Sequence, residues 1–381
     1  MATSQAMRRR EGAVRGVGLL VVVMALLALA ACAGDEEPDA DPEPPDPSEE
    51  PDEDAPDDAA DEDEDEGADE AGDGESHLTL DEPDDADEPE GPPLPLTGEP
   101  AADEDALDEP VVATKVDNHP SARPPVSVQD ADVVYVQLIE HGLTRLVALH
   151  HSEVPERVGP VRSGRRVEAE LLPPFDPALA ISGAQEHILG ELRQAGLRLY
   201  LEGARGTWER DPERPAPHDL FVHAASVRED AREAGLSAPE VPWEHAEEAP
   251  EAARSVRGAE LTYPGGSSTT SWSWDEQDER FQRSQNGSPH GAASGERLTA
   301  DNVLVARVAP TGIEERPFEV QGSGELTLLR DGKAIEGRWE KPGPGAHHRW
   351  LDADGDPLPL APGTTWVELV GTNGSVALDE E

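Results

Sequence analysis

Cysteine is almost missing from this sequence of 381 residues, because Cys32 is the only one. A single thiol cannot form a disulfide within the chain, and it cannot supply a cysteine-rich zinc site. Lysine is equally scarce, since Lys115, Lys333 and Lys341 are the only three, and the chain has just 4 Phe and 3 Tyr. Any folded region must therefore be stabilised by its apolar core rather than by covalent or metal links.

Basic residues are absent from Asp35 to Glu109, a stretch that holds 37 of the 83 acidic residues. The rest of the chain has 46 acidic and 30 basic residues, so its net charge is about −16 against −53 for the whole. So negative a protein repels phosphate backbones, and we expect no nucleic-acid partner. Genomic base composition and adaptation to high salt both remain open as explanations of the acidity and the scarcity of lysine.

The N-terminus has the three regions of an export signal. Arg8, Arg9, Arg10 and Arg15 are followed by an apolar run over residues 17–31, which is shorter than the ~20 residues needed to cross a bilayer. The order Leu-Ala-Ala-Cys at 29–32 resembles the lipobox of bacterial lipoproteins, in which the cysteine receives acyl chains such as palmitate. We predict a signal peptide over 1–31, lipidation at Cys32 and a lipid anchor at the extracytoplasmic face of the cell membrane. The alternative is a plain anchor or secretory signal with an incidental cysteine.

An acidic tether is predicted over residues 32–93, where Asp, Glu, Pro, Ala and Gly dominate. Such a segment has too little apolar surface to offset its ordering entropy, and like charges swell it further. Roughly 60 residues reach about 45 Å as a neutral coil and at most about 200 Å when extended. We interpret it as a disordered spacer through the cell wall. A segment that collects divalent cations or docks a basic partner is the alternative, although no ligand spacing supports it.

The remaining chain predicts an α+β fold in two halves. A mixed α/β domain over 94–240 is followed by a Pro- and Glu-rich linker over 241–258 and a β-rich domain over 259–376. In the first half, strands are expected at 111–116, 132–139 and 143–150, the last two as a hairpin, and helices at 184–195 and 225–234. Strands are expected in the second half at 260–263, 303–308, 324–329, 334–339 and 365–370.

Several short motifs occur in one order along both halves. They are PLTG at 95–98, KVDNH at 115–119 with ARP at 122–124, ADVVY at 131–135, GPVRS at 159–163, APH at 216–218, DNVLV at 301–305, GSG at 322–324, DGK at 331–333, GRW at 337–339 and PGTTW at 362–366. Through these motifs and their order, the chain resembles the YerB family of bacterial lipoproteins. That family is also known as DUF3048, a two-part domain of unknown function. The resemblance implies architecture and location, and it implies no activity or cofactor.

Three arginines gather in the run VGPVRSGRR at 158–166: Arg162, Arg165 and Arg166. A guanidinium is a planar fork suited to carboxylate or phosphate. One interpretation is an anion site for a peptidoglycan or teichoic-acid group. The other is internal ion pairing with the abundant Asp and Glu.

Two further positions are candidates for ligand binding. His218 lies in a proline-framed loop, where a histidine can serve as base or metal ligand, or can simply bond a backbone carbonyl. Lys115 and Asp117 lie at the end of a predicted strand, together with Asn118 and His119, and polar groups converge there in many α/β sites.

Catalytic and metal motifs are otherwise missing. Ser163 and Ser182 lack the Gly-x-Ser-x-Gly elbow, so no catalytic residue is assigned. The adjacent pairs 150–151 and 347–348 place two histidines on opposite faces of a strand, and no His-Glu-x-x-His motif occurs, so no metal is expected. Tryptophans at 272, 274, 339, 350 and 366 are candidates for a sugar platform or for core packing.

The sequence therefore favours a membrane-anchored binding or regulatory module of cell-envelope assembly, with a wall polymer or an envelope protein as partner. An envelope hydrolase or transferase that uses Lys115, Asp117, Arg162 and His218 is the alternative. Convergence of these four side chains in one concave pocket would favour ligand capture or catalysis, and separate ion pairs would favour an interaction module.

Overall fold

The computed structural model of the chain describes residues 91–203, 206–240 and 242–380. The predicted signal peptide, the lipidation site at Cys32 and the tether up to residue 90 lie outside these ranges. Within them, the fold is α+β, with helices only in the first half and strands throughout, as the sequence predicts.

The first half alternates strands with short helices. The helix expected at 184–195 spans 186–194, and the one expected at 225–234 spans 224–233. The elements are η1 (Glu104–Asp108), β1 (Val112–Asp117), η2 (Pro120–Ala122), β2 (Val133–Leu138), η3 (Glu140–Gly142), β3 (Thr144–His150), α1 (Glu168–Leu171), η4 (Pro173–Phe175), β4 (Ala178–Ile181), α2 (Glu186–Gln194), β5 (Arg198–Leu201), β6 (Trp208–Arg210), β7 (Leu220–Val222) and α3 (Ala224–Glu233).

The second half consists of strands joined by turns. All five strands expected there are present, most of them longer than the apolar runs that predicted them. They are β8 (Arg254–Thr262), β9 (Thr269–Asp275), β10 (Arg280–Gln285), β11 (Ser288–Pro289), β12 (Thr299–Ala300), β13 (Asn302–Ile313), β14 (Arg316–Glu319), β15 (Gly322–Arg330), β16 (Lys333–Lys341), β17 (Arg349–Leu351), β18 (Thr365–Gly371) and β19 (Ser375–Glu380).

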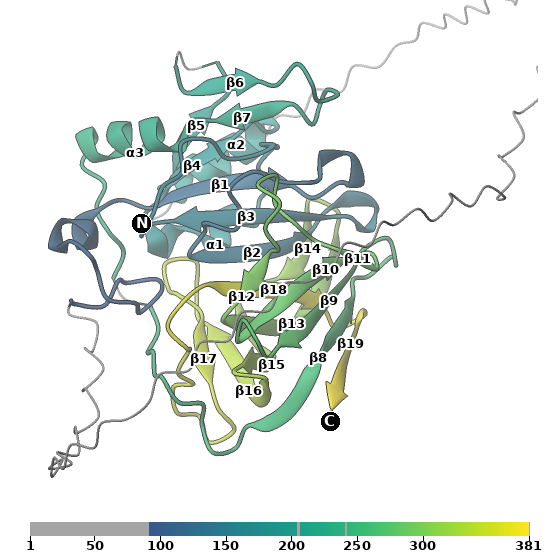
Figure 1. Cartoon of the computed structure of the whole chain (residues 1–381). Helices are drawn as coiled ribbons and strands as arrows, with labels where there is room; N and C mark the ends of the chain where they lie inside the picture. Colours follow the sequence, from purple (N-terminus) through teal and green to yellow (C-terminus); the bar gives the residue numbers. More distant parts are fainter. Residues whose placement is uncertain (1–90, 204–205, 241, 381) are drawn as a thin grey trace, which may run out of the picture. The chain divides into compact units, whose positions relative to one another are not determined.

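One mixed sheet runs through both halves in the order β5-β4-β1-β3-β2-β18-β13-β15-β16. β2 and β3 form the expected antiparallel hairpin, whose turn contains His141 at φ +64 and Gly142 at φ +72. The halves meet where β18 pairs in parallel with β2, with Thr365 opposite Val133 (Figure 1). Beyond β16, the long strand β8 carries β19 on one side and β9 and β10 on the other.

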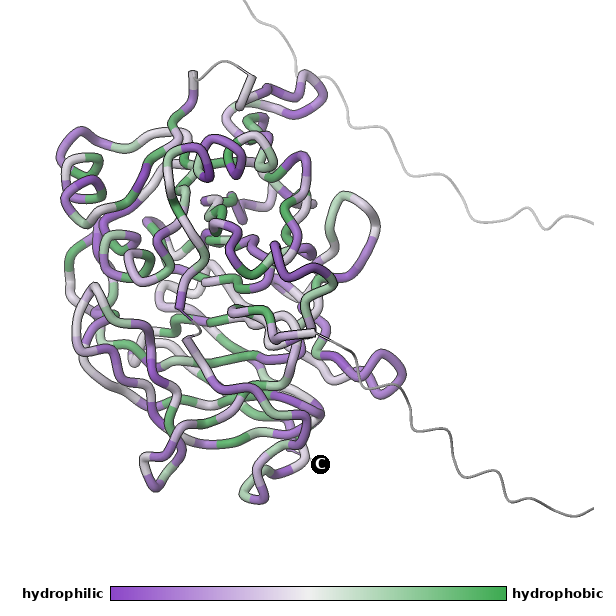
Figure 2. The backbone as a smooth tube through the Cα atoms, turned by 90° about the vertical axis from the view of Figure 1, so that its left-hand side faces the viewer, coloured by the Kyte–Doolittle hydropathy of each residue, from purple (hydrophilic) through white to green (hydrophobic). Residues whose placement is uncertain are grey.

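Side chains alternate between two apolar cores, one on each face of this sheet. Along β2, Val133 and Tyr135 enter one core while Val134 and Val136 enter the other, as the two-residue period of a strand requires. Both cores contain residues from both halves, so neither half buries its apolar surface alone. In Figure 2, hydrophobic residues gather in the interior of the fold and hydrophilic ones in the connecting loops.

The helices of the first half lie against this sheet. β4, α2 and β5 form a parallel βαβ unit at one end of it. None of the helices in the described ranges is both long enough and apolar enough to cross a membrane. The domain boundaries given above stay predictions.

Candidate functional site

A polar row crosses the sheet at the carboxyl end of β1. Arg145 of β3 is the register partner of both Asp117 in β1 and Gln137 in β2, so the three side chains point to the same side. The neighbouring row on that side contains Lys115 opposite Val147. The rest of β1 is fully buried and, apart from Thr114, apolar, and this fixes the position of the polar end.

Lys115 belongs to a buried ion pair of its own. Its Nζ lies 2.5 Å from Oε1 of Glu168 in α1, and both side chains are 0 % exposed. The Nζ also donates to the side-chain oxygen of Gln137. Burial lowers the pKa of Lys115 to about 8, and the charge of Glu168 opposes this shift. The pair links α1 to the sheet and is closed to solvent.

Asp117, His218 and Arg162 meet around one carboxylate oxygen. Oδ2 of Asp117 lies 2.8 Å from Nδ1 of His218 and 3.2 Å from Nε of Arg162. The ring of His119 stacks on that of His218 at 4.8 Å and 11°. A carboxylate bound to one ring nitrogen orients a histidine and leaves its other nitrogen for a ligand or a proton.

The loop that follows Arg162 runs beside the loop that follows β4. The Ser182 amide donates to the Arg162 carbonyl at 3.1 Å, the Gly164 amide donates to the Gly183 carbonyl at 3.0 Å, and the hydroxyls of Ser163 and Ser182 lie 3.3 Å apart. A cavity of about 450 Å³ opens here at the amino end of α2, which no side chain caps. Its lining consists of Glu140, Ser163, Arg165, Gly183, Ala184, Gln185, Ile188 and Glu315.

Arg145 is a buried cation between two other arginines. It is only 6 % exposed and donates to the carbonyl of Ser163 at 3.2 Å. Within the described residues, no carboxylate lies within 4.0 Å of its guanidinium. Burial lowers the pKa of Arg145 to about 10; the charges of Arg165 and Arg162 lower it further, and those of Asp117 and Glu140 oppose this shift. The arginine site, as we name Arg145, Arg162 and Arg165 together, is therefore short of negative charge.

The other predicted arginines have their own carboxylates. Arg165 binds Glu140 with two hydrogen bonds of 2.8 Å, so it lines the cavity as half of an ion pair. Arg166 pairs with Glu191 at 2.7 Å, where both side chains are about one third exposed. Of the four residues expected to converge, Asp117, Arg162 and His218 do so, and Lys115 does not.

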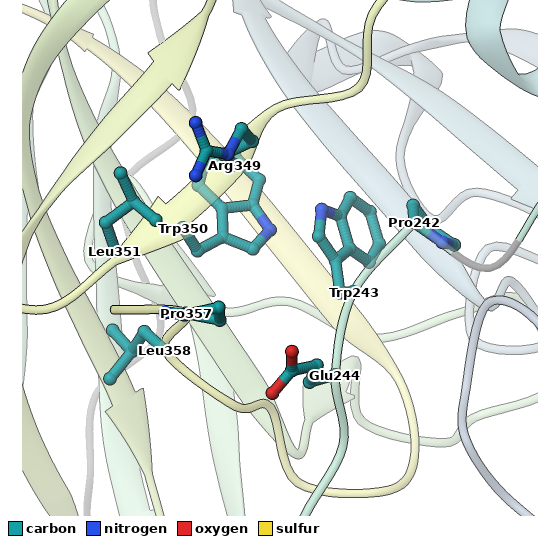
Figure 3. A pocket seen from close by; sticks show the side chains of 8 residues that line it. All are labelled: Pro242, Trp243, Glu244, Arg349, Trp350, Leu351, Pro357 and Leu358. Atoms are coloured by element: carbon teal, nitrogen blue, oxygen red, sulfur yellow. The ribbon is translucent and has the colours of Figure 1, made fainter. Parts of the chain in front are cut away.

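The remaining candidates have structural roles. In the ranges that the structure describes, no three His, Cys, Asp or Glu side chains are arranged to hold a metal ion. Trp272, Trp339, Trp350 and Trp366 are at most 3 % exposed and belong to the cores, although Trp350 also lines a cavity (Figure 3), as the partly buried Trp274 does.

Sequence reasoning missed Arg145, together with Glu140 and Glu168, the carboxylates that neutralise its neighbours. The signal for Arg145 was a cation beside the apolar run LVAL in the predicted strand 143–150, which reads LTRLVALH. A charged side chain on the buried face of a strand is costly and therefore informative. Neither carboxylate had such a signal, because both lie in short helical turns among many other acidic residues.

Comparison with known proteins finds relatives along most of the chain. Residues 96–237 match the description "Protein of unknown function (DUF3048) N-terminal domain", and residues 259–367 match the corresponding C-terminal domain. The chain is 27% identical over 272 residues to "Putative lipoprotein YerB" of Bacillus subtilis (strain 168), covering 68% of this chain and 80% of that protein.

The fold also matches a solved structure, the crystal structure of the YerB protein from Bacillus subtilis. The TM-score is 0.66 at 23% identity, and the match covers 75% of this chain and 99% of that chain. Both halves of the described fold are therefore shared with that protein. The two matched domains and the similarity to a relative named as a lipoprotein identify this chain as a member of the DUF3048 family, to which the YerB lipoproteins belong.

Proposed function

We propose that this protein is anchored to the extracytoplasmic face of the cell membrane through lipid at Cys32, and that its folded part is a binding module of cell-envelope assembly. The ligand is an anionic group of a wall polymer, captured at the arginine site beside the 450 Å³ cavity. Lipidation is supported by the Leu-Ala-Ala-Cys motif and by the name of the relative.

The observation that carries the anion site is the uncompensated charge of Arg145. A buried guanidinium without a carboxylate costs free energy unless an anion joins it. Around it, Arg162 and Arg165 bring two more positive charges, and Asp117 and Glu140 bring two negative ones. The site thus has a net charge of about +1 in a folded region that is strongly negative overall, which favours a phosphate or carboxylate ligand.

The test is titration of the full chain in detergent micelles with glycerol-phosphate oligomers and with muropeptides. Arg162→Ala is expected to weaken binding about tenfold, because a charge-assisted hydrogen bond contributes roughly 1.5 kcal/mol or more. Arg166→Ala is the matched control, since that guanidinium is paired with Glu191. Equal affinities of the wild type and Arg162→Ala would exclude the site.

A second variant separates binding from a purely structural role. Arg145→Met replaces an unpaired buried cation with an apolar side chain of similar length, so it should leave stability unchanged or raise it by about 1 kcal/mol. The same change should abolish binding of the anionic oligomers. If Arg145→Met instead unfolded the protein, the charge would be a structural requirement and the proposal would lose its main support.

The alternative is an envelope hydrolase or transferase, and the contact between Asp117 and His218 favours it. In that mechanism His218 is the general base and Asp117 orients its ring. Among the described residues, however, no serine hydroxyl is hydrogen-bonded to His218, so a nucleophile is missing from the pair. Turnover of wall polymers that is lost in His218→Gln would establish the enzyme, and retention of binding without turnover would support the module.

A further inference from the structure

Two stacked histidines next to Arg162 each have a ring nitrogen that is open to a ligand. The rings of His119 and His218 lie 4.8 Å apart, with 11° between their planes, and both side chains are partly exposed. Their Nδ1 atoms are bonded within the protein. Among the described residues, neither Nε2 atom has a hydrogen-bond partner, and neither is buried. We call His119 and His218, with these two free nitrogens, the histidine pair.

The two free nitrogens differ in what they offer a ligand. Nδ1 of His119 accepts the Ser121 amide at 3.1 Å, and a ring nitrogen accepts only when it has no proton. The proton of the His119 ring is therefore on Nε2, which is a donor. Nδ1 of His218 lies 2.8 Å from Oδ2 of Asp117, a carboxylate that can only accept, so Nδ1 is the protonated nitrogen of this ring. In a neutral ring, Nε2 of His218 is then an acceptor.

Arg162 supplies a positive charge beside the histidine pair, but part of its guanidinium is already engaged. Its Nε lies 3.2 Å from Oδ2 of Asp117, the oxygen that His218 also binds, and its Nη1 donates to the Pro217 carbonyl at 3.0 Å. The side chain is 23 % exposed, so the rest of the guanidinium is open to a ligand. A carboxylate binds best to two parallel N–H groups of one guanidinium, whereas phosphate oxygens also accept single N–H groups from separate donors. Arg162 and His119 therefore suit a phosphate better than a carboxylate.

Arg123 makes the surroundings of Asp117 more positive. Its Nε donates to the Asn118 carbonyl at 3.3 Å, and within the described ranges no carboxylate forms an ion pair with its partly exposed side chain. Burial and the charge of Arg283 lower the pKa of Arg123, and the charge of Asp117 opposes this shift. The positive charges of Arg123 and Arg162 together exceed the single negative charge of Asp117, and this excess attracts an anion.

We propose that the histidine pair makes the anion site specific for a polyol phosphate, in which a hydroxyl group lies close to each phosphate. One phosphate oxygen accepts from Nε2 of His119 and another from Arg162, while the neighbouring hydroxyl donates to Nε2 of His218. Asp117 orients His218 and Arg162 and does not touch the ligand. This inference rests on the proposed function, because it names the chemical class of the anion. Of the two wall components named above, it selects the glycerol-phosphate chain.

The experiment compares two hexamers of glycerol phosphate, one with free hydroxyls and one with every hydroxyl capped as a methyl ether. Both are titrated calorimetrically into the full chain in detergent micelles at about pH 8, where a free imidazole is neutral. The wild type should bind the free hexamer about tenfold more tightly, because capping removes the hydrogen bond to His218. His218→Asn keeps an N–H for Asp117 and removes the acceptor. It should weaken binding of the free hexamer about tenfold and leave binding of the capped hexamer unchanged.

Two further variants separate the roles of the histidines. His119→Asn keeps an oxygen that can accept the Ser121 amide and removes the outer N–H, so it should weaken binding of both hexamers to the same extent. His223→Asn is the matched control, since His223 also lies beside a carboxylate, with Nε2 at 3.6 Å from Glu209, and is not part of the histidine pair. This variant should bind both hexamers as the wild type does.

The outcomes distinguish the ligand class from the anion site itself. Equal binding of the two hexamers by the wild type, or equal weakening of both by His218→Asn, would overturn the role of the histidine pair and leave the anion site standing. Tighter binding of a muropeptide than of the free hexamer would overturn the choice of phosphate. If the wild type bound neither hexamer, or if Arg162→Ala bound both as tightly as the wild type, the proposed function would fail and this inference with it.

Discussion

Removal of the charge from Glu168 should strongly destabilise this protein. In Glu168→Gln, protonated Lys115 would remain fully buried with only neutral partners, whereas the native pair is 2.5 Å apart with both side chains 0 % exposed. Breaking such a pair by neutralising one partner costs about 3 to 5 kcal/mol. For a domain of this size, that corresponds to a decrease in Tm of roughly 6 to 20 °C.

The matched control is Glu191→Gln, the same chemical change in the pair with Arg166, where both side chains are about one third exposed. Exposed ion pairs contribute about 0 to 1 kcal/mol, so this variant should unfold close to the wild type. Urea unfolding followed by tryptophan fluorescence measures both. Equal decreases in unfolding free energy in the two variants would refute the reasoning, because burial would then make no difference to how much an ion pair stabilises the fold.

The loss of unfolding free energy in Glu168→Gln, which we call the deficit, should depend on pH, and this gives an independent check. The folded pKa of Lys115, about 8, lies below its usual value of 10.5, so the folded protein binds fewer protons between these values and gains stability as the pH rises through them. Without Glu168, the pKa of Lys115 falls further and the gain begins at lower pH. The deficit of Glu168→Gln should therefore be largest near pH 5 and smaller at pH 9, and a constant deficit would contradict this account.

Three other perturbations have defined outcomes. Burial lowers the pKa of His348 to about 3, so its contribution to stability is present above pH 6.5 and is lost on acidification. Between pH 6.5 and 4.5, the free energy of unfolding of His348→Phe should therefore decrease by about 2 kcal/mol less than that of the wild type, as measured by thermal melts. A Cβ at Gly258 would lie 2.0 Å from the Trp272 carbonyl oxygen, so Gly258→Ala should destabilise the protein by about 3 kcal/mol. A Cβ at Gly190 in α2 would meet no atom within 4 Å, so Gly190→Ala should stabilise the protein by about 0.5 to 1 kcal/mol. In cells grown with labelled palmitate, the wild-type protein should carry the label and Cys32→Ser should not. Equal labelling of both would rule out this lipidation site.

Local elements were predictable because their signals are local. Alternation over residues 132–150 predicted the hairpin of β2 and β3, and helical periodicity placed α2 within two residues. The joint between β2 and β18 had no such signal. Thr365 pairs with Val133 across most of the folded chain, and both strands are buried on both faces and mostly apolar, so either could have paired with many others.

The candidate site was predictable in part for the same reason. Asp117 is the last residue of the buried strand β1, and this places it at the end of the sheet where His218 reaches it. Residue types alone could not divide the arginines, because an arginine that pairs with a carboxylate and one that lacks a partner have the same sequence signature. Arg165 and Arg166 have Glu140 and Glu191, whereas Arg145 has only a carbonyl, and that difference depends on tertiary contacts.

The parallel pairing of β2 with β18 has a consequence for the integrity of the protein. A protease that cut the linker between the halves would not release them, because backbone hydrogen bonds and two common cores would still hold the fragments together. Conversely, a chain that ended before residue 365 would expose the edge of β2 and one flank of β13 to neighbouring molecules. The sheet is therefore complete only after β18 has been synthesised, and chains truncated before β18 are expected to aggregate.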